Sequence, residues 1–197
     1  MKTNMPNTLA PIRIVGLSGS LRSGSYNAQL LRAAVALAPE GVTITTGTIR
    51  GIPLYDGDVE AAEGIPPLVA ALKDDIAAAD GLLLVTPEYN NSIPGVFKNA
   101  IDWLTRPADD IARVFGAKPV GLIGASPGGF GTILSQNAWL PVLRTLGTEP
   151  YFAGRLMVSR AHKAFAENDA LADPAMEAML KGYLEGFAQF VRARTAA

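Results

Sequence analysis

Apolar residues of this 197-residue chain fall into short continuous runs and longer, helically spaced stripes. Short runs bounded by Gly, Pro, Ser or Thr predict strands; they cover 12–18, 42–49, 81–85, 118–125 and 151–158. Stripes at helical spacing predict five helices. The first ends at about 38, the second begins at 66–67, the third begins after 94–95, the fourth covers about 132–146 and the last includes 176–190. Runs that are apolar at nearly every position suit parallel strands covered by helices on both faces.

Some positions within these helices carry further expectations. The faces expected to be buried are Leu68, Leu72 and Ile76, then Val96, Phe97, Ala100, Ile101 and Leu104, and finally Met176, Met179, Leu180, Tyr183, Phe187 and Phe190. Pro141 predicts a kink or a break in its helix, because proline removes a backbone hydrogen bond. We expect Trp103, Phe115 and Trp139 to be core or subunit-contact residues.

The alternation of strands and helices predicts an α/β fold, a doubly wound five-stranded parallel sheet with helices on both faces. Five strands suit the order 2-1-3-4-5. We expect one domain over 12–197, preceded by a loose tail over 1–11. In this order the loops after strands one, three and four meet at one edge of the sheet, where α/β proteins bind ligands.

Composition and charge exclude several classes of function. The net charge of −1 gives no electrostatic pull toward nucleic acid or anionic membrane. The absence of cysteine excludes disulfides, iron–sulfur clusters and dithiol chemistry. The single histidine, His162, excludes a histidine-rich metal site within one chain, and we expect it on the surface. Redox chemistry here would therefore need a bound cofactor.

The chain contains no run with the length and apolarity of a membrane span. Residues 1–11 are polar, contain two prolines and lack the apolar stretch of a signal peptide. We therefore expect a cytoplasmic protein with neither a membrane nor a nucleic-acid partner.

The loop over 19–27 follows a strand and opens a helix, which is the arrangement of an anion site. A dinucleotide fingerprint is absent, and Ser25-Tyr26 stand where an NTPase P-loop needs lysine followed by Ser or Thr. A mononucleotide phosphate needs only amides and hydroxyls, and Ser20, Asn27 and Arg22 add polar and cationic groups. The alternative is a solvated turn with serine capping.

The loops after strands three and four are also candidates for ligand binding. Pro87-Glu88-Tyr89-Asn90 can present backbone polar groups to a flat ring, and 126–129 can present amides. Ligand-free turns are the alternative for both. Residues 124–128 also match G-x-S-x-G, but Pro127 lacks the N–H that a hydrolase oxyanion hole requires.

Longer stretches carry a family resemblance. Residues 86–90, Ser92, Pro94-Gly95 and 98–103 resemble the signature of the NAD(P)H-dependent FMN reductase family. The loop Ser20-Leu21-Arg22, Gly24-Ser25 and Asn27 is similar to the FMN phosphate loop of that family. Residues 52–56 with Asp58 look like its quinone and chromate reductase branch.

The resemblance implies a flavodoxin-like fold with noncovalent FMN and NAD(P)H as the electron donor. It also implies ping-pong hydride transfer through N5 of the flavin to a quinone, free flavin or similar small-molecule acceptor, with chromate and azo compounds as further acceptors. The residues that it places at the cofactor are Ser18, Ser20, Leu21, Arg22, Ser25, Tyr26, Asn27, Pro87, Glu88, Tyr89, Asn90, Ser126, Gly128 and Gly129.

The same resemblance implies a homodimer or homotetramer with the active sites near subunit boundaries. We assign no side chain as a catalytic acid or base, and no metal. An FMN electron carrier that reacts poorly with NAD(P)H is the alternative function, although such carriers tend to be strongly acidic. A flavin-free scaffold is a third alternative, against which the phosphate loop argues.

Overall fold

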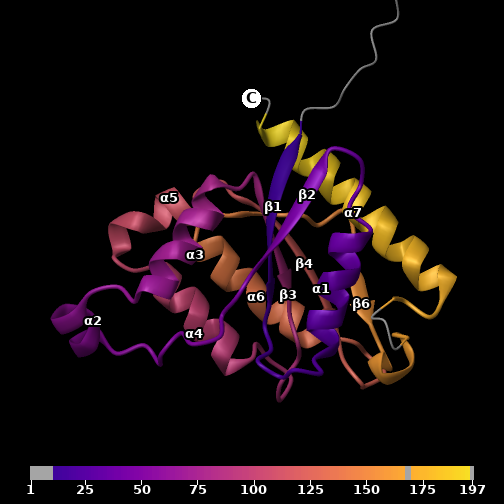
Figure 1. Cartoon of the computed structure of the whole chain (residues 1–197), viewed down its shortest axis with the longest axis horizontal. Helices are drawn as coiled ribbons and strands as arrows, with labels where there is room; N and C mark the ends of the chain where they lie inside the picture. Colours follow the sequence, from indigo (N-terminus) through magenta and orange to yellow (C-terminus); the bar gives the residue numbers. More distant parts are fainter. Residues whose placement is uncertain (1–10, 167–169, 196–197) are drawn as a thin grey trace, which may run out of the picture.

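Parallel strands form one sheet in the computed structural model, which describes residues 11–166 and 170–195 (Figure 1). The strand order is β2-β1-β3-β4-β5, and β6 also pairs with β4. The predicted α/β class and the order 2-1-3-4-5 are confirmed. Apart from Pro11, the tail expected over 1–11 lies outside the described residues.

The bounds of the elements follow the predicted alternation. The strands are β1 (Ile12–Ser18), β2 (Val42–Gly47), β3 (Gly81–Val85), β4 (Pro119–Ala125), β5 (Glu149–Pro150) and β6 (Leu156–Val158). The helices are α1 (Tyr26–Ala36), α2 (Gly57–Glu63), α3 (Pro67–Ala78), α4 (Gly95–Leu104), α5 (Ile111–Phe115), α6 (Ile133–Thr145) and α7 (Pro174–Thr195). Sequence reasoning missed α2 and α5, because α2 buries no side chain and α5 is a single short turn.

Helices cover both faces of the sheet, as predicted (Figure 1). On one face Leu31 of α1 and Phe187 of α7 share a core cluster with Ile14 of β1. Helices α3, α4, α5 and α6 pack on the other face, against alternate residues of β1 and β3. Trp103, Phe115 and Trp139 are buried in this second cluster, so their assignment to the core is confirmed. No helix of the described chain is long and apolar enough to cross a membrane.

Three residues expected on buried helix faces are exposed instead, and the expectation was wrong for them. Leu68 is 51% exposed, Val96 37% and Met179 54%. Each lies at the margin of a narrower buried stripe; in α3 that stripe is Val69, Leu72, Lys73 and Ile76. An apolar residue at the edge of a helical stripe can remain in solvent at little cost, because exposed apolar residues are common on protein surfaces.

Pro141 does not break α6, which runs continuously from Ile133 to Thr145. The proline leaves the carbonyl of Asn137, four residues earlier, without its helical donor. Both residues are exposed, so water can serve that carbonyl.

Of the strand predicted over 151–158, only its end forms a strand, β6, while β5 lies just before the predicted bounds; the two short strands pair end to end with β4. Between them the backbone N–H of Leu122 donates to the hydroxyl oxygen of Tyr183 at 2.7 Å. Burial raises the pKa of Tyr183 and keeps this hydroxyl protonated. The Tyr183 side chain of α7 thus takes the place of a strand's backbone beside Leu122. The local sequence of 151–155 cannot reveal this contact.

The connection over 50–65 is fixed to α4 by polar contacts. The indole N–H of Trp103 donates to the carbonyl oxygen of Pro53 at 2.9 Å, and the side-chain amide of Asn99 donates to the same oxygen at 2.8 Å. Asn99 also accepts the N–H of Tyr55 at 2.8 Å. Helix α2, which lies within this connection, is at the far left of Figure 1.

A buried cation links α3 to the segment after α4. Lys73 is 2% exposed, and its ammonium lies 2.5 Å from the carboxylate of Asp110. Arg113 donates to the same carboxylate at 3.2 and 3.3 Å. Arg113 and Lys73 together hold the pKa of Asp110 at about 2, below its usual range.

Asp110→Asn should destabilise the protein at neutral pH and much less in acid. The lowered pKa in the folded state means that the carboxylate stabilises the fold above its ordinary pKa, of about 4, and loses this effect as pH falls toward 2. Urea unfolding midpoints of wild type and variant should therefore converge as the pH falls from about 4 to about 2. Asp109→Asn, the same change at the exposed neighbour, should show no such convergence.

Candidate functional site

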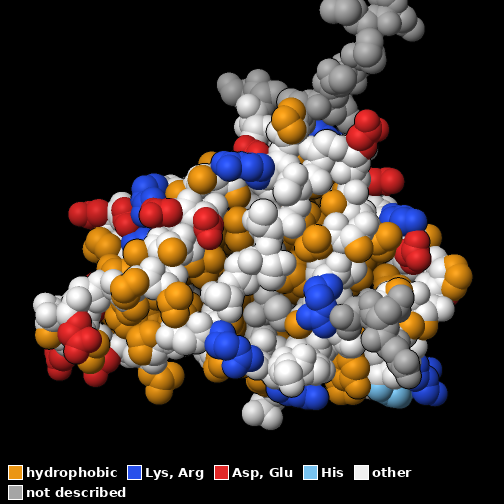
Figure 2. All heavy atoms as spheres, viewed as in Figure 1, with side chains coloured by type: hydrophobic (Ala, Val, Ile, Leu, Met, Phe, Trp, Pro, Cys, Tyr) orange, Lys and Arg blue, Asp and Glu red, His pale blue; other side chains and the backbone are white. Residues whose placement is uncertain are grey.

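The carboxyl ends of β1, β3 and β4 lie side by side, since Ser18 pairs with Val85 and Val85 with Ile123. The loops that follow enclose a hollow of about 60 Å³. Its lining residues are Ser20, Arg22, Ser25, Tyr26, Asn27, Pro87, Glu88, Tyr89, Ala125, Ser126 and Pro127. Figure 2 shows basic side chains along the lower part of this view, where the loops leave the sheet, and acidic ones at the far left over α2.

Most of the residues predicted at the cofactor line this one hollow. Those outside the lining are Ser18, Leu21, Asn90, Gly128 and Gly129, which belong to the same three loops or the end of β1. Sequence reasoning missed Ala125 and Pro127, which lie beside Ser126 in the chain. It also missed Phe165, whose ring stacks on Tyr26 at 6.3 Å between centroids. No sequence signal connects these two rings, because they are far apart in the chain.

The first loop ends in a capped helix. The Ser25 hydroxyl oxygen accepts the backbone N–H groups of Asn27 and Ala28, at 3.2 and 3.3 Å. The side chain of Asn27 exchanges two hydrogen bonds with the backbone of Ala125, at 2.8 and 2.9 Å. Both polar atoms of Asn27 are therefore engaged, and this side chain ties the first loop to the end of β4.

Two polar side chains around the first loop make no hydrogen bond within the described part of the chain. The hydroxyl of Ser18 is buried without a hydrogen-bond partner. It lies at the end of β1, on the face that Ile14 presents to α1. Arg22 is exposed, and only its backbone N–H is engaged, with Ser20 at 3.3 Å. A buried hydroxyl is costly unless it is bonded, so Ser18 suits a polar ligand above β1.

The second loop makes a tight turn that the sequence encodes. Tyr89 and Ser92 exchange backbone hydrogen bonds across Asn90 and Asn91. Both asparagines have positive φ, 50° and 62°, as the two central residues of a type I′ turn require. The Tyr89 hydroxyl lies 3.3 Å from the Ser20 hydroxyl and so joins the second loop to the first.

The second loop is also fixed to α6. The buried Thr86 hydroxyl lies 2.9 Å from that of Ser135 and accepts the indole N–H of Trp139 at 3.0 Å. The Glu88 carboxylate accepts the N–H groups of Leu134 and Ser135 at 2.8 and 3.1 Å.

The third loop closes on itself and rests on the segment after β6. The Ser126 hydroxyl donates to the carbonyl of Gly131 at 2.5 Å, and Ala161 donates its N–H to the Ser126 carbonyl at 3.0 Å. Gly131 has a φ of +62°, and a Cβ there would lie 2.8 Å from Met157. At Gly129 a Cβ would meet no atom within 4 Å, so neither packing nor φ requires glycine at that position.

The hydrolase alternative receives no support from the geometry. Ser126 donates to Gly131, and His162 is on the surface as expected. Among the described residues no group of three His, Asp or Glu side chains could hold a metal ion.

Comparison with known proteins identifies the family of this chain. The model of the NADPH-dependent FMN reductase family matches residues 12–163. An NAD(P)H-dependent FMN reductase of Pseudomonas aeruginosa is 42% identical over 92% of this chain and 96% of its own length. A quinone reductase of Escherichia coli is 36% identical over 92% of this chain and 96% of its own length.

A solved structure shares the fold closely. It is FerB, a flavoenzyme NAD(P)H:(acceptor) oxidoreductase from Paracoccus denitrificans, with a TM-score of 0.84. It is 32% identical in sequence and covers 93% of this chain and 98% of its own. The flavodoxin-like fold expected from the sequence is thereby confirmed.

The residues of the site fit FMN. A phosphate needs hydrogen-bond donors and a counter-charge, which Ser18, the start of α1 and Arg22 offer. A hollow of about 60 Å³ suits a group of phosphate size. The open space around Gly129 allows a ring to approach the backbone of the third loop.

Ser18→Ala should weaken FMN binding without lowering the stability of the FMN-free protein. Removing an unpaired buried hydroxyl relieves a desolvation cost, whereas a hydrogen bond to a charged group is worth about 1.5–3 kcal/mol, or roughly tenfold or more in Kd. Fluorescence titration with FMN and urea unfolding measure the two effects. Ser23→Ala, at an exposed position of the same loop, should change neither; a destabilised Ser18→Ala apoprotein would contradict this assignment.

Proposed function

The chain belongs to the NADPH-dependent FMN reductase family, and we propose that its three loops hold FMN beside the carboxyl ends of β1, β3 and β4. The protein is an NAD(P)H-dependent oxidoreductase with FMN as its cofactor. The observation that carries the proposed site is that most of the residues predicted at the cofactor, from all three loops, line one polar hollow. We also propose that residues 12–197 form a single domain.

The first loop would hold the phosphate. The N-terminus of α1 places the positive end of the helix dipole at this point. Arg22 supplies a cation, and Ser18, Ser20 and Ser25 supply hydroxyls. Leu21 contributes through its backbone, since its carbonyl accepts the guanidinium of Arg50 and so keeps the loop close to the end of β2.

The second and third loops would hold the ring system. Pro87 and Asn90 offer backbone polar groups beside a turn whose shape is fixed by the backbone pairing of Tyr89 with Ser92. Gly128 and Gly129 offer amides without side chains in the way. FMN, when bound, accepts hydride from NAD(P)H and passes two electrons to a second substrate. The contribution of the protein is orientation at close range, so we propose no catalytic acid or base.

A quinone is the acceptor that we propose. The support is the name of the Escherichia coli relative, quinone reductase, at 36% identity. Reduction of chromate or azo compounds stays a prediction from the sequence, as does the cytoplasmic location.

The visible spectrum of purified protein with FMN, before and after anaerobic NADPH and then NADH, tests this function. We expect bound flavin that bleaches rapidly with at least one donor, followed by recovery of colour when a benzoquinone is added. Bound flavin that stays yellow with both donors would favour the electron carrier, and protein that binds no FMN would contradict the three-loop site. A heat-unfolded sample controls for reduction of free flavin.

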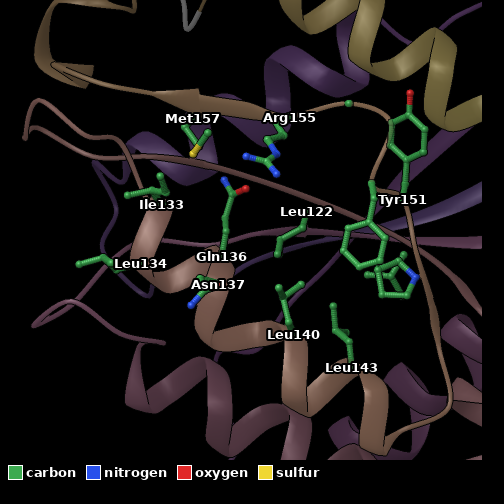
Figure 3. Close-up of a pocket in the computed structure, with 14 residues that line it drawn as sticks. Leu122, Ile133, Leu134, Gln136, Asn137, Leu140, Leu143, Tyr151, Arg155 and Met157 are labelled. Carbon is green, nitrogen blue, oxygen red and sulfur yellow. The ribbon is translucent and has the colours of Figure 1, made fainter.

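We further propose that a second copy of the chain covers an apolar groove beside the site. The groove, of about 360 Å³, lies between α6 and the segment from β5 to β6 (Figure 3). Leu122, Leu140 and Leu143 lie along it in Figure 3, with Leu134 near one end and Tyr151 near the other. Exposed apolar surface of this kind marks protein interfaces. Leu134 lines the groove and donates its backbone N–H to Glu88, which lines the hollow, so the groove and the hollow are adjacent. This adjacency supports a homodimer or homotetramer with its active sites near subunit boundaries.

Phe152→Asp should weaken this self-association. Phe152 lines the groove and is 67% exposed, and burying an aromatic ring is worth about 1.5–3 kcal/mol, or roughly tenfold or more in Kd. Sedimentation velocity across a concentration series measures the shift toward monomer. Met179→Asp, a 54% exposed residue of α7 on the other face of the sheet, is the matched control. A wild-type protein that sediments as a monomer at all concentrations would contradict the proposal.

A further inference from the structure

Glu88 has a contact that its place in a ligand-binding loop does not predict. Its carboxylate accepts the backbone N–H groups of Leu134 and Ser135 at 2.8 and 3.1 Å. These are the second and third residues of α6, counted from Ile133. An N-cap side chain normally bonds these two groups from the residue just before the helix.

The residue before α6 does not provide that cap. Thr132 makes no capping hydrogen bond with its side chain, and its hydroxyl instead accepts the amide of Gln136 at 3.1 Å. The first N–H groups of a helix have no partner within the helix and need an acceptor from elsewhere. Glu88 supplies this acceptor from 46 residues earlier in the chain.

The contact joins two segments that the proposed site requires to be fixed relative to each other. Pro87 and Tyr89, which flank Glu88, line the hollow. Helix α6 begins directly after the third loop, which ends at Gly131. Displacement of the Glu88 carboxylate would therefore release the second loop from the helix that follows the third.

The contact also places the charge of Glu88. A carboxylate at a helix N-terminus is stabilised by the positive end of the helix dipole. The hollow that Glu88 borders would receive an anionic cofactor, so a carboxylate directed at the ligand would repel it. Engagement by α6 reduces that repulsion.

We infer that Glu88 is a positioning residue that caps α6 and thereby sets the spacing of the second and third loops around FMN. This inference rests on the proposed FMN site. It assigns the carboxylate to the helix rather than to the flavin, and leaves the backbone of 87–90 to face the ring.

Three variants test the inference. Glu88→Ala removes the acceptor and its charge, while Glu88→Gln keeps an acceptor oxygen without the charge. Asp173→Ala is the matched control, because Asp173 accepts the N–H of Ala175 at 2.9 Å at the start of α7 and does not line the hollow. The measurements are the thermal midpoint of the FMN-free protein and the Kd values for oxidised and reduced FMN.

We expect Glu88→Ala to lower the midpoint and to raise both Kd values by roughly tenfold, with their ratio unchanged. Glu88→Gln should restore most of the affinity, again at an unchanged ratio. Asp173→Ala should lower the midpoint and leave both Kd values within about twofold of wild type.

Each contrary result has a distinct meaning. A ratio that changes tenfold or more in Glu88→Gln would show that the charge acts on the flavin and would overturn the inference. An unchanged midpoint in Glu88→Ala, or equal loss of FMN affinity in Asp173→Ala, would also overturn it. Wild-type protein that binds no FMN would contradict the proposed site itself, whatever the midpoints of the variants.

Discussion

Backbone groups at the carboxyl ends of parallel strands need partners beyond the ladder, and the site is built from the residues that supply them. Asn27 is the central case, because both atoms of its side-chain amide bond the backbone of Ala125, 98 residues away. A buried backbone group without a partner would cost free energy comparable to a lost hydrogen bond. This pairing therefore holds the first loop beside the end of β4, and the spacing of the hollow depends on it.

The second loop is held by a different set of contacts on the other side of the hollow. Thr86 is fully buried and lies within hydrogen-bond distance of Ser135 and Trp139 of α6. A polar cluster buried among apolar residues tolerates little displacement, since any unpaired member pays its desolvation cost. The loop is thus fixed before any ligand arrives, and preorganisation of this kind reduces the entropy lost when a cofactor and a substrate are aligned for hydride transfer.

The sequence predicts the strands and loops of this protein better than it predicts the side-chain contacts between them. Apolar runs predict the central strands β3 and β4 directly, because these are buried on both faces and read as continuous runs. The strand order follows from the fold class rather than from the runs themselves. The three loops follow from their polar residues and their positions after strands. The pairing of Tyr183 with Leu122 and that of Glu88 with α6 could not be predicted, because both join residues that no local period or spacing relates. The same is true of Asn27: the sequence suggests a side chain available to a phosphate, whereas its amide bonds the backbone of Ala125.

The glycines of the loops fall into two groups: those that packing within the chain requires and those that it does not. A Cβ at Gly19 would lie 2.2 Å from the ring of Phe97, and one at Gly124 would lie 2.1 Å from the Thr132 hydroxyl. Packing within the chain accounts for glycine at these two positions. At Gly24 and Gly129 a Cβ would have no neighbour within 4 Å, and neither position has a positive φ. Neither packing nor backbone conformation therefore requires glycine there, and the two positions lie on the first and third loops of the proposed FMN site, where a glycine lets a ligand approach the backbone.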